Sequence, residues 1–207
     1  MKVLSHRGYW KDKVEKNCEV AFKRSFDLGF GTETDIRDQN GTLVISHDMP
    51  TCNQMTLATF LQIVGNRDLP FALNIKADGL TVPLVQAMRS TGLNNWFVFD
   101  MAVPDMRAYL QAGIPVFSRM SEVELVPAWL DQVAGIWLDS FADTWYDAGL
   151  VKNLLQSGKK ICVVSPELHG RNADALWTML RPFADHSALM LCTDHPEKAQ
   201  EFFGASQ

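Results

Sequence analysis

The sequence predicts an α/β fold, a closed and compact (β/α)8 TIM barrel. Short apolar runs rich in β-branched residues recur along the whole chain, and helix-periodic stretches lie between most of them. The length of 207 residues suits one such barrel if its helices and loops are short. We therefore expect a single domain over residues 1–207, with two small domains as the weaker alternative.

Eight apolar runs are expected to form the barrel strands, at residues 2–5, 31–36, 71–75, 96–99, 115–117, 135–138, 160–164 and 188–192. Helices are expected at residues 19–28, 56–64, 82–89, 105–111, 146–156 and 173–180. Gly29, Gly92 and Gly158 each follow a helical stretch and precede a strand, as glycine does at helix ends. Strands that are apolar throughout, such as 71–75, are typical of a parallel sheet covered by helices.

One short run does not fit the simple alternation of strand and helix. Residues 43–46 are strand-like and follow Asn40-Gly41, a dipeptide that favours a tight hairpin turn. We expect this run to form a short strand excursion after the second barrel strand.

Composition excludes several classes of protein. With 47% hydrophobic and 21% charged residues, the chain is typical of folded proteins rather than disordered ones. The net charge is −5 and no block of like charge is present, which disfavours nucleic acid as a partner. No run of about 18 apolar residues occurs, so stable membrane insertion is not expected. Four scattered cysteines and the lack of a signal-peptide segment predict a cytoplasmic protein with free thiols.

Ionisable residues collect at the ends of expected strands, where a parallel barrel places its functional groups. His6 follows the first strand, Glu33 and Asp35 lie on the second, and His47 follows the excursion. Glu33 and Asp35 are two residues apart and share one face, so a divalent cation with oxygen ligands is their natural partner. The alternatives are an exposed acidic pair on a solvated edge and two structural histidines. Convergence of all four groups at one end of the barrel favours a catalytic site.

The first 48 residues carry a spaced motif. It consists of His6-Arg7-Gly8, Asn17 with Ala21-Phe22, Gly29, Glu33-x-Asp35, Gly41 and His47-Asp48. In order and spacing this motif resembles the glycerophosphodiester phosphodiesterase family. Weaker matches at Asn74-Ile75-Lys76 and Thr193-Asp194-His195-Pro196 extend the resemblance over nearly the whole chain. More distantly, the chain is similar to phosphatidylinositol-specific phospholipases C and spider-venom phospholipase D toxins.

The resemblance implies a phosphoric diester hydrolase that splits a glycerophosphodiester into glycerol 3-phosphate and an alcohol. It makes His6 and His47 the general acid and base, and it implies attack by the substrate's own glycerol 2-hydroxyl, giving a cyclic phosphate that water then opens. The remaining roles fall on the metal ligands Glu33, Asp35 and Asn74 and the phosphate contacts Arg7 and Lys76. The implied cofactor is a divalent metal ion, Mg or Ca.

The sequence departs from the family at two positions. The family usually has Glu-x-Lys on its third strand, where this chain has Asn74 and Lys76. An amide oxygen carries no charge, so weaker binding of a hard cation is expected unless water, Asp48, Asp78 or Glu167 compensates. Glu15 is displaced by one residue from the family position before Asn17, so we do not assign it to the metal.

A polar loop at residues 165–171 follows the seventh strand, on the face where catalytic groups are expected. Glu167 and His169 are candidate substrate contacts, and a helix cap through Asn172 is the structural alternative. The expected partner is a small, soluble phosphodiester, because short loops leave little room for a lipid-binding insertion. The sequence leaves the oligomeric state open.

Two other functions compete with hydrolysis. One is a catalytically silent barrel that binds a phosphate ester or sugar phosphate and has lost its metal with the third carboxylate. The other is a metal-dependent isomerase or aldolase, which also uses histidines and carboxylates at strand ends. The spacing from His6-Arg7-Gly8 to Glu33-x-Asp35 disfavours the isomerase.

Overall fold

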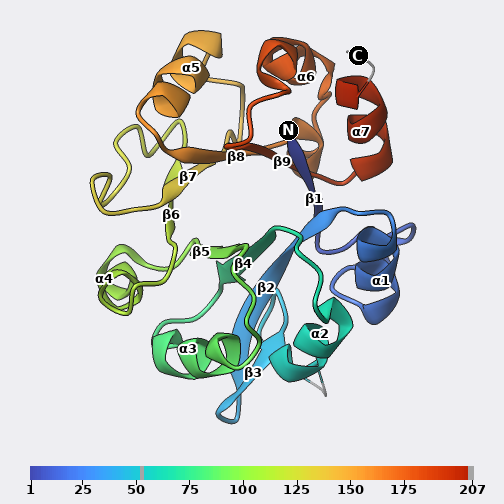
Figure 1. Cartoon of the computed structure of the whole chain (residues 1–207), viewed down its shortest axis with the longest axis vertical. Helices are drawn as coiled ribbons and strands as arrows, with labels where there is room; N and C mark the ends of the chain where they lie inside the picture. Colours follow the sequence, from blue (N-terminus) through green and yellow to red (C-terminus); the bar gives the residue numbers. More distant parts are fainter. Residues whose placement is uncertain (52–53, 205–207) are drawn as a thin grey trace.

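A computed structural model describes residues 1–51 and 54–204, and these residues form the predicted barrel (Figure 1). The strands are β1 (Lys2–His6), β2 (Gly31–Gln39), β3 (Thr42–Ile45), β4 (Phe71–Ile75), β5 (Trp96–Phe99), β6 (Phe117–Met120), β7 (Gly135–Leu138), β8 (Lys160–Val164) and β9 (Leu189–Thr193). They follow the order β5-β4-β2-β1-β9-β8-β7-β6, with β3 paired to β2. The β5–β6 seam is held by one parallel bridge, Val98 to Val116, so the ring is nearly closed.

Helices cover the outside of the ring (Figure 1). They are α1 (Glu19–Asp27), α2 (Leu57–Val64), α3 (Thr81–Arg89), α4 (Val103–Gln111), α5 (Ala148–Gln156), α6 (Asp174–Leu180) and α7 (Pro196–Gly204), with short 3-10 turns at Lys13–Glu15, Pro166–His169 and Arg181–Phe183. Side-chain caps begin two of the predicted helices, because Thr56 accepts from the Thr59 amide and Asp147 from the Leu150 amide. Helix α7 was not expected from the sequence, although Pro196 at its first position is a typical start signal.

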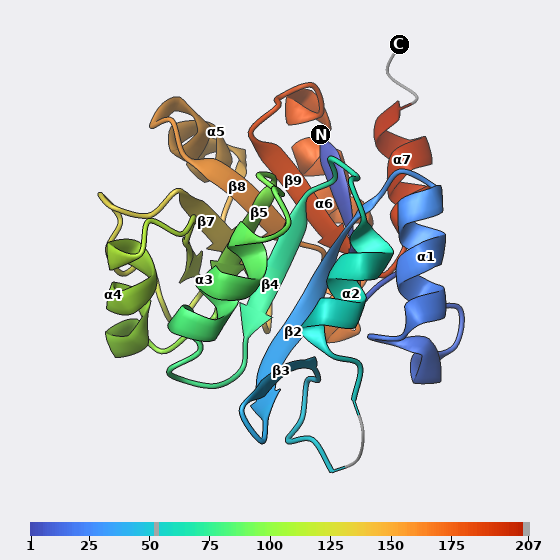
Figure 2. The ribbon, with the colours of Figure 1, turned by 60° about the horizontal axis from the view of Figure 1, so that its bottom comes forward.

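The β3 excursion is confirmed. Antiparallel pairing of Ile36 with Ile45 and of Gln39 with Thr42 makes β2 and β3 a hairpin around Asn40-Gly41. This hairpin projects past the carboxyl ends of the neighbouring strands (Figure 2). Its return leg leads directly to His47.

The connection between β6 and β7 departs from the alternating pattern. Residues 121–134, all of them described, contain no helix. Pro127 lies in the middle of this segment, where it lacks a backbone donor and opposes helix formation. Strand β6, expected at residues 115–117, begins later, at Phe117, because Val116 makes only the single bridge to β5.

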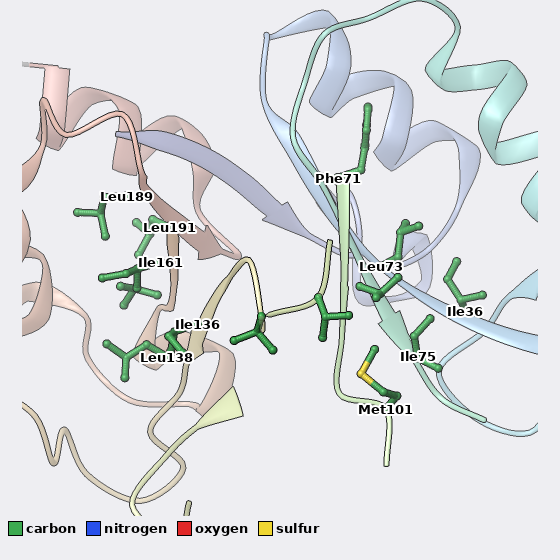
Figure 3. Packing of buried hydrophobic residues seen from close by; sticks show 14 of the residues in the cluster. Ile36, Phe71, Leu73, Ile75, Met101, Ile136, Leu138, Ile161, Leu189 and Leu191 are labelled. Carbon is green, nitrogen blue, oxygen red and sulfur yellow. The ribbon is translucent and has the colours of Figure 1, made fainter. Parts of the chain in front are cut away.

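Apolar side chains form two layers, one between the strands and the helices and one inside the barrel. Outward side chains such as Leu73 and Ile75 of β4, and Ile161 of β8, pack under the helices (Figure 3). A separate inner cluster fills the barrel: Leu4, Ala72, Phe97, Phe99, Phe117, Trp137, Cys162, Val164, Met190 and Cys192. Because every second strand residue points inward, the next inward positions toward the carboxyl ends are His6, Asn74, Arg119, Asp139 and Asp194. The barrel interior therefore changes from apolar to polar at its carboxyl mouth.

Two further expectations concern cysteines and membranes. Cys18, Cys162 and Cys192 are free thiols, and Cys52 lies outside the described residues. None of the helices in the described ranges combines the length and hydropathy needed to cross a bilayer.

Candidate active site

The carboxyl ends of β1, β2 and β4 bring the predicted site residues together. In the sheet register His6 pairs with Glu33, and Asp35 pairs with Asn74. Glu33, Asp35 and Asn74 are all buried. Asp35 and Asn74 lie at one level on adjacent strands, and Glu33 lies two residues before Asp35 on the same face of β2. Two carboxylates and one amide therefore lie close together at the mouth.

Each of these three side chains has a buried oxygen without a hydrogen-bond donor: Glu33 Oε2, Asp35 Oδ1 and Asn74 Oδ1. Buried oxygens are normally hydrogen-bonded, since an unpaired one costs about 1–3 kcal/mol. Oxygen atoms of this kind are the ligands that Mg²⁺ and Ca²⁺ take in proteins. The described ranges hold no group of three or more His, Cys, Asp and Glu side chains spaced for a metal ion. The third donor here is an amide, so the residues fit a hard cation with two charged ligands.

The electrostatics of the Glu33–Asp35 pair also favour a bound cation. Burial, followed by the charge of the neighbouring Asp35, raises the pKa of Glu33 to about 8. The positive charges of Arg7 and Lys76 oppose this rise. A buried acidic pair is thus under repulsive strain that an added positive charge would relieve.

Asp35 is fixed by its neighbours. Asn17 Nδ2 donates to Asp35 Oδ2 at 2.8 Å, and Arg7 Nε lies 3.0 Å from the same oxygen. Lys76 Nζ lies 3.5 Å from the other oxygen, and Thr34 donates to Asn17 Oδ1 at 2.9 Å. Sequence reasoning gave Asn17 no role, and the structure shows that it orients Asp35.

The backbone of the first loop is held in an uncommon conformation. Arg7 and Asn17 have φ of 58° and 60°, in the left-handed region that most residues avoid. Gly8 has φ of 81°, and a Cβ there would lie 2.8 Å from Ala21 Cβ. The Arg7 amide donates to the Glu33 carbonyl at 2.9 Å. The loop therefore needs glycine after Arg7 to bring that arginine over β2.

His6 has a carboxylate partner that lies far away in the sequence. Its Nδ1 lies 2.8 Å from Asp194 Oδ1, while its Nε2 lies 4.0 Å from Glu33 Oε2. Burial lowers the pKa of His6, and the hydrogen bond to Asp194 opposes that effect. Asp194 directs one ring nitrogen and leaves the other facing the carboxylate pair. The only sequence signal for this role was its place after the last strand.

Asp194 is held in turn by Glu167. The Glu167 carboxylate accepts from the hydroxyls of Ser165 and Thr193 and from the Asp194 amide. Both of its oxygens are thus engaged within the protein. Glu167 was predicted as a substrate contact, and its observed contacts make it a support for Asp194 and so for His6.

His47 lies beside the same site, on the loop after β3. Its Nδ1 lies 2.8 Å from Asp48 Oδ1, and its carbonyl accepts from Arg37 Nε at 3.2 Å. The Ser46 amide donates to the Asp35 carbonyl at 3.1 Å, which ties this loop to β2. The hydrogen bond with His47 lowers the pKa of Asp48, and the charge of Arg7 adds to that lowering. For His6, burial lowers the pKa most, and the charge of Arg7 again adds to the effect. Arg7 therefore lies near both histidine loops.

The other half of the mouth carries a second set of charges. Arg119 Nη1 lies 3.2 Å from Asp100 Oδ1, and His169 Nε2 lies 2.8 Å from Asp139 Oδ1. Asp100 has a φ of 66°, another strained position at a strand end. Burial raises the pKa of Asp100, and interactions with Arg119, Lys76 and Asn74 oppose the rise. Asp100 therefore connects this half to the Asn74 side.

Two of the three carboxylates that might replace a third charged ligand, Asp48 and Glu167, are engaged elsewhere. Asp48 pairs with His47, and Glu167 is occupied as described. Glu15 lies 2.8 Å from Arg24, an ion pair that lowers the pKa of Glu15 to about 2. The exclusion of Glu15 from the metal site agrees with this contact.

Comparison with known proteins establishes the fold. No protein-family model matches the chain, and no curated protein matches its sequence. A phosphodiesterase from Oleispira antarctica, solved with the product sn-glycerol-3-phosphate, superposes with a TM-score of 0.75 at 15% identity, over 99% of this chain and 97% of that one. A glycerophosphodiester phosphodiesterase from Agrobacterium tumefaciens gives 0.71 at 15% identity, over 99% and 98%. A Ca²⁺-dependent phosphatidylinositol-specific phospholipase C from Streptomyces antibioticus gives 0.51 at 12%, over 98% and 95%. The chain thus has the barrel fold of these proteins.

Proposed function

We propose that this protein is a metal-assisted phosphodiesterase that hydrolyses a glycerophosphodiester to glycerol 3-phosphate and an alcohol. One observation carries the proposal: three buried oxygens that lack a hydrogen-bond donor lie on adjacent strands, beside His6 and next to the loop that bears His47. The fold shared with glycerophosphodiester phosphodiesterases supports it.

The two histidines supply the proton transfers. One takes the proton from the glycerol 2-hydroxyl as that oxygen attacks phosphorus, and the other gives a proton to the departing alcohol oxygen. The cyclic phosphate then reacts with water while the histidines exchange roles, and the ring opens to glycerol 3-phosphate. Asp194 and Asp48 hold the Nδ1 side of each ring, which leaves Nε2 for the substrate.

The charged groups hold the phosphate and the cofactor. Glu33, Asp35 and Asn74 would hold Mg²⁺ or Ca²⁺, which when bound neutralises charge on the phosphate oxygens. Arg7 and Lys76 each contact a different oxygen of Asp35, so both add positive charge beside the proposed phosphate position. His169, in the second half of the mouth, remains a candidate contact to the substrate. A cytoplasmic location remains a prediction from the sequence.

One observation favours a second candidate, the silent barrel that binds a phosphate ester. Arg7 and Lys76 already compensate the charge of Asp35, and Asn74 supplies no charge. A site balanced in this way can hold a phosphate ester without a metal ion.

Turnover with and without metal separates the two candidates. The substrates are glycerophosphocholine and bis(p-nitrophenyl) phosphate, assayed with Mg²⁺, Ca²⁺ or a chelator, beside the His47→Ala variant. The proposal expects turnover that the chelator abolishes and that the variant lacks. Absence of turnover with every metal, together with binding of phosphate esters, would instead establish the silent barrel.

A further inference from the structure

A cleft opens beside the proposed phosphodiesterase site. It lies between the residues after β5 and the segment 121–128 after β6, and its volume is about 510 Å³. Pockets of this size accommodate small ligands. Asp100 and Arg119 lie at its edge, which places the cleft at the carboxyl mouth of the barrel.

The polar end of the cleft is continuous with the phosphate site. Arg119 forms ion pairs with Asp100 and Glu124, and all three residues line the cleft. Asp100 follows Phe99, which pairs with Asn74 in the sheet, so Asp100 lies next to the end of β4 that leads to Lys76. A ligand whose phosphate lies at Lys76 would therefore extend past Asp100 into the cleft.

Much of the wall of the cleft is apolar, and part of it is exposed. The apolar lining side chains are the buried Met101 and Met106 together with Val103, Val123, Leu125, Val126 and Ala128. Val123 and Val126 are 77% and 82% exposed. A group of exposed apolar side chains marks a binding site more often than an ordinary surface.

These side chains stand on an ordered turn. The Glu124 amide donates to the Ser121 carbonyl at 3.0 Å, and the Ser121 amide donates back to the Glu124 carbonyl at 3.3 Å. The Ser121 hydroxyl also donates to the Glu124 carboxylate. Val123 is thus presented to solvent by a hydrogen-bonded turn whose backbone groups are satisfied.

We propose that this cleft binds one hydrocarbon chain of the substrate, so that the natural phosphodiester is an amphiphile. Its phosphodiester lies at the mouth and its chain lies against Val123, Leu125 and Val126. The inference rests on the proposed function and refines the expectation of a small, soluble phosphodiester. The chain belongs either to the leaving alcohol or to an acyl group on glycerol, and the two arms of the experiment distinguish these sources.

The first arm uses glycerophosphodiesters of ethanol, butanol, hexanol and octanol, and the second uses glycerophosphocholines acylated with butanoyl, hexanoyl and octanoyl groups. All are assayed below the concentration at which they aggregate. We expect kcat/KM to rise about fourfold for each methylene that becomes buried, in the arm whose chain occupies the cleft and not in the other. Flat kcat/KM in both arms would overturn the proposal.

Two variants locate the effect. The double variant Val123→Asn with Val126→Asn is expected to remove most of the chain-length dependence and to leave turnover of the shortest ester unchanged. The matched control is Val14→Asn, because Val14 is 81% exposed on another loop of the mouth and does not line the cleft. Equal losses in both variants would assign the dependence to non-specific contact with any exposed apolar side chain and would contradict the cleft.

A binding measurement tests the cleft without requiring catalysis. Calorimetry with octyl phosphate and inorganic phosphate should show tighter binding of the octyl ester to the wild type, and the double variant should lose that difference. If no ester is hydrolysed, the proposed function fails, yet this binding difference would still support the cleft. A dimer that the double variant dissociates, with no preference for octyl phosphate, would assign the apolar wall to a second copy of the chain and overturn the inference.

Discussion

The two halves of the barrel mouth use the same strand geometry and differ in how their polar groups are satisfied. On β1, β2 and β4, the buried oxygens of Glu33, Asp35 and Asn74 lack hydrogen-bond donors. On β5 to β8, Asp100 pairs with Arg119 and Asp139 pairs with His169, although Glu122 Oε2 and Arg171 Nε also lack a hydrogen-bond partner. Two adjacent buried carboxylates whose oxygens lack donors are costly in a free protein and indicate a cation, while separate ion pairs can hold a shape. The first half is thus suited to chemistry and the second to recognition.

Removal of a histidine from the first half should have the largest effect. His6→Ala is expected to lower kcat/KM by about 100-fold or more, because it removes a group that transfers a proton in the reaction. Steady-state kinetics on glycerophosphocholine measures the loss. His186→Ala is the control, since His186 is exposed just before β9, at the opposite end of the barrel. Similar rates for His6→Ala and the wild type would contradict the paired-histidine mechanism.

One His–Asp pair from each half, His6–Asp194 and His169–Asp139, provides a direct contrast, since both have a nitrogen–oxygen distance of 2.8 Å. Asp194→Asn is expected to lower kcat by about 10 to 100-fold with little change in KM, as loss of an orienting carboxylate does. Asp139→Asn, which alters the equivalent contact to His169, should leave kcat nearly unchanged.

The pH profile separates orientation of His6 from a purely structural role. The Asp194 hydrogen bond raises the pKa of His6 against the lowering effect of burial. Its removal lowers that pKa further, so the limb of the profile that reports His6 should move to lower pH. An unmoved profile in Asp194→Asn, or equal losses of kcat in both Asn variants, would show that the halves do not differ as described.

The charge of the third ligand sets a smaller effect. Asn74→Glu adds a carboxylate to the site and should tighten Ca²⁺ binding by about tenfold, since affinity for a hard cation rises with ligand charge. Calorimetric titration measures the change. Asn74→Gln has the same length without the charge and should not tighten binding. Unchanged affinity in Asn74→Glu would remove Asn74 from the site.

The backbone of the first loop offers a test on stability. Gly8→Ala should lower the free energy of unfolding by about 1–3 kcal/mol more than Gly41→Ala. Both glycines have a φ near 80°, but only at Gly8 does an added Cβ meet Ala21. Thermal or urea unfolding compares the two variants. Equal destabilisation would show that the contact under Gly8 relaxes and does not fix the loop.

Local sequence patterns predicted the barrel, the β3 excursion and the residues that meet at the first half of the mouth. Their signal is short-range, because His6 ends one strand and Glu33 and Asp35 lie on the next, and the apolar runs of both strands are plain in the sequence. The role of Asp194 was not predicted because its partner His6 lies 188 positions away, and only closure of the ring joins β9 to β1. The role of Asn17 in orienting Asp35 was not predicted because it depends on a left-handed backbone conformation that the sequence does not reveal.

The second half was less predictable for a different reason. Periodicity identifies apolar faces but not which of them a neighbouring element covers. Val123 and Val126 look like core residues in the sequence, and Pro127 prevents the helix that would have buried them. The exposed wall of the cleft therefore emerged only from the structure.

The most direct test of the account follows the reaction of a glycerophosphodiester by phosphorus NMR with saturating Ca²⁺ or Mg²⁺. We expect the phosphodiester signal to be replaced by that of glycerol 3-phosphate in the wild type and to persist in His47→Ala. A phosphodiester signal that persists in the wild type, while titration still shows binding of the ester, would contradict hydrolysis and leave a binding barrel.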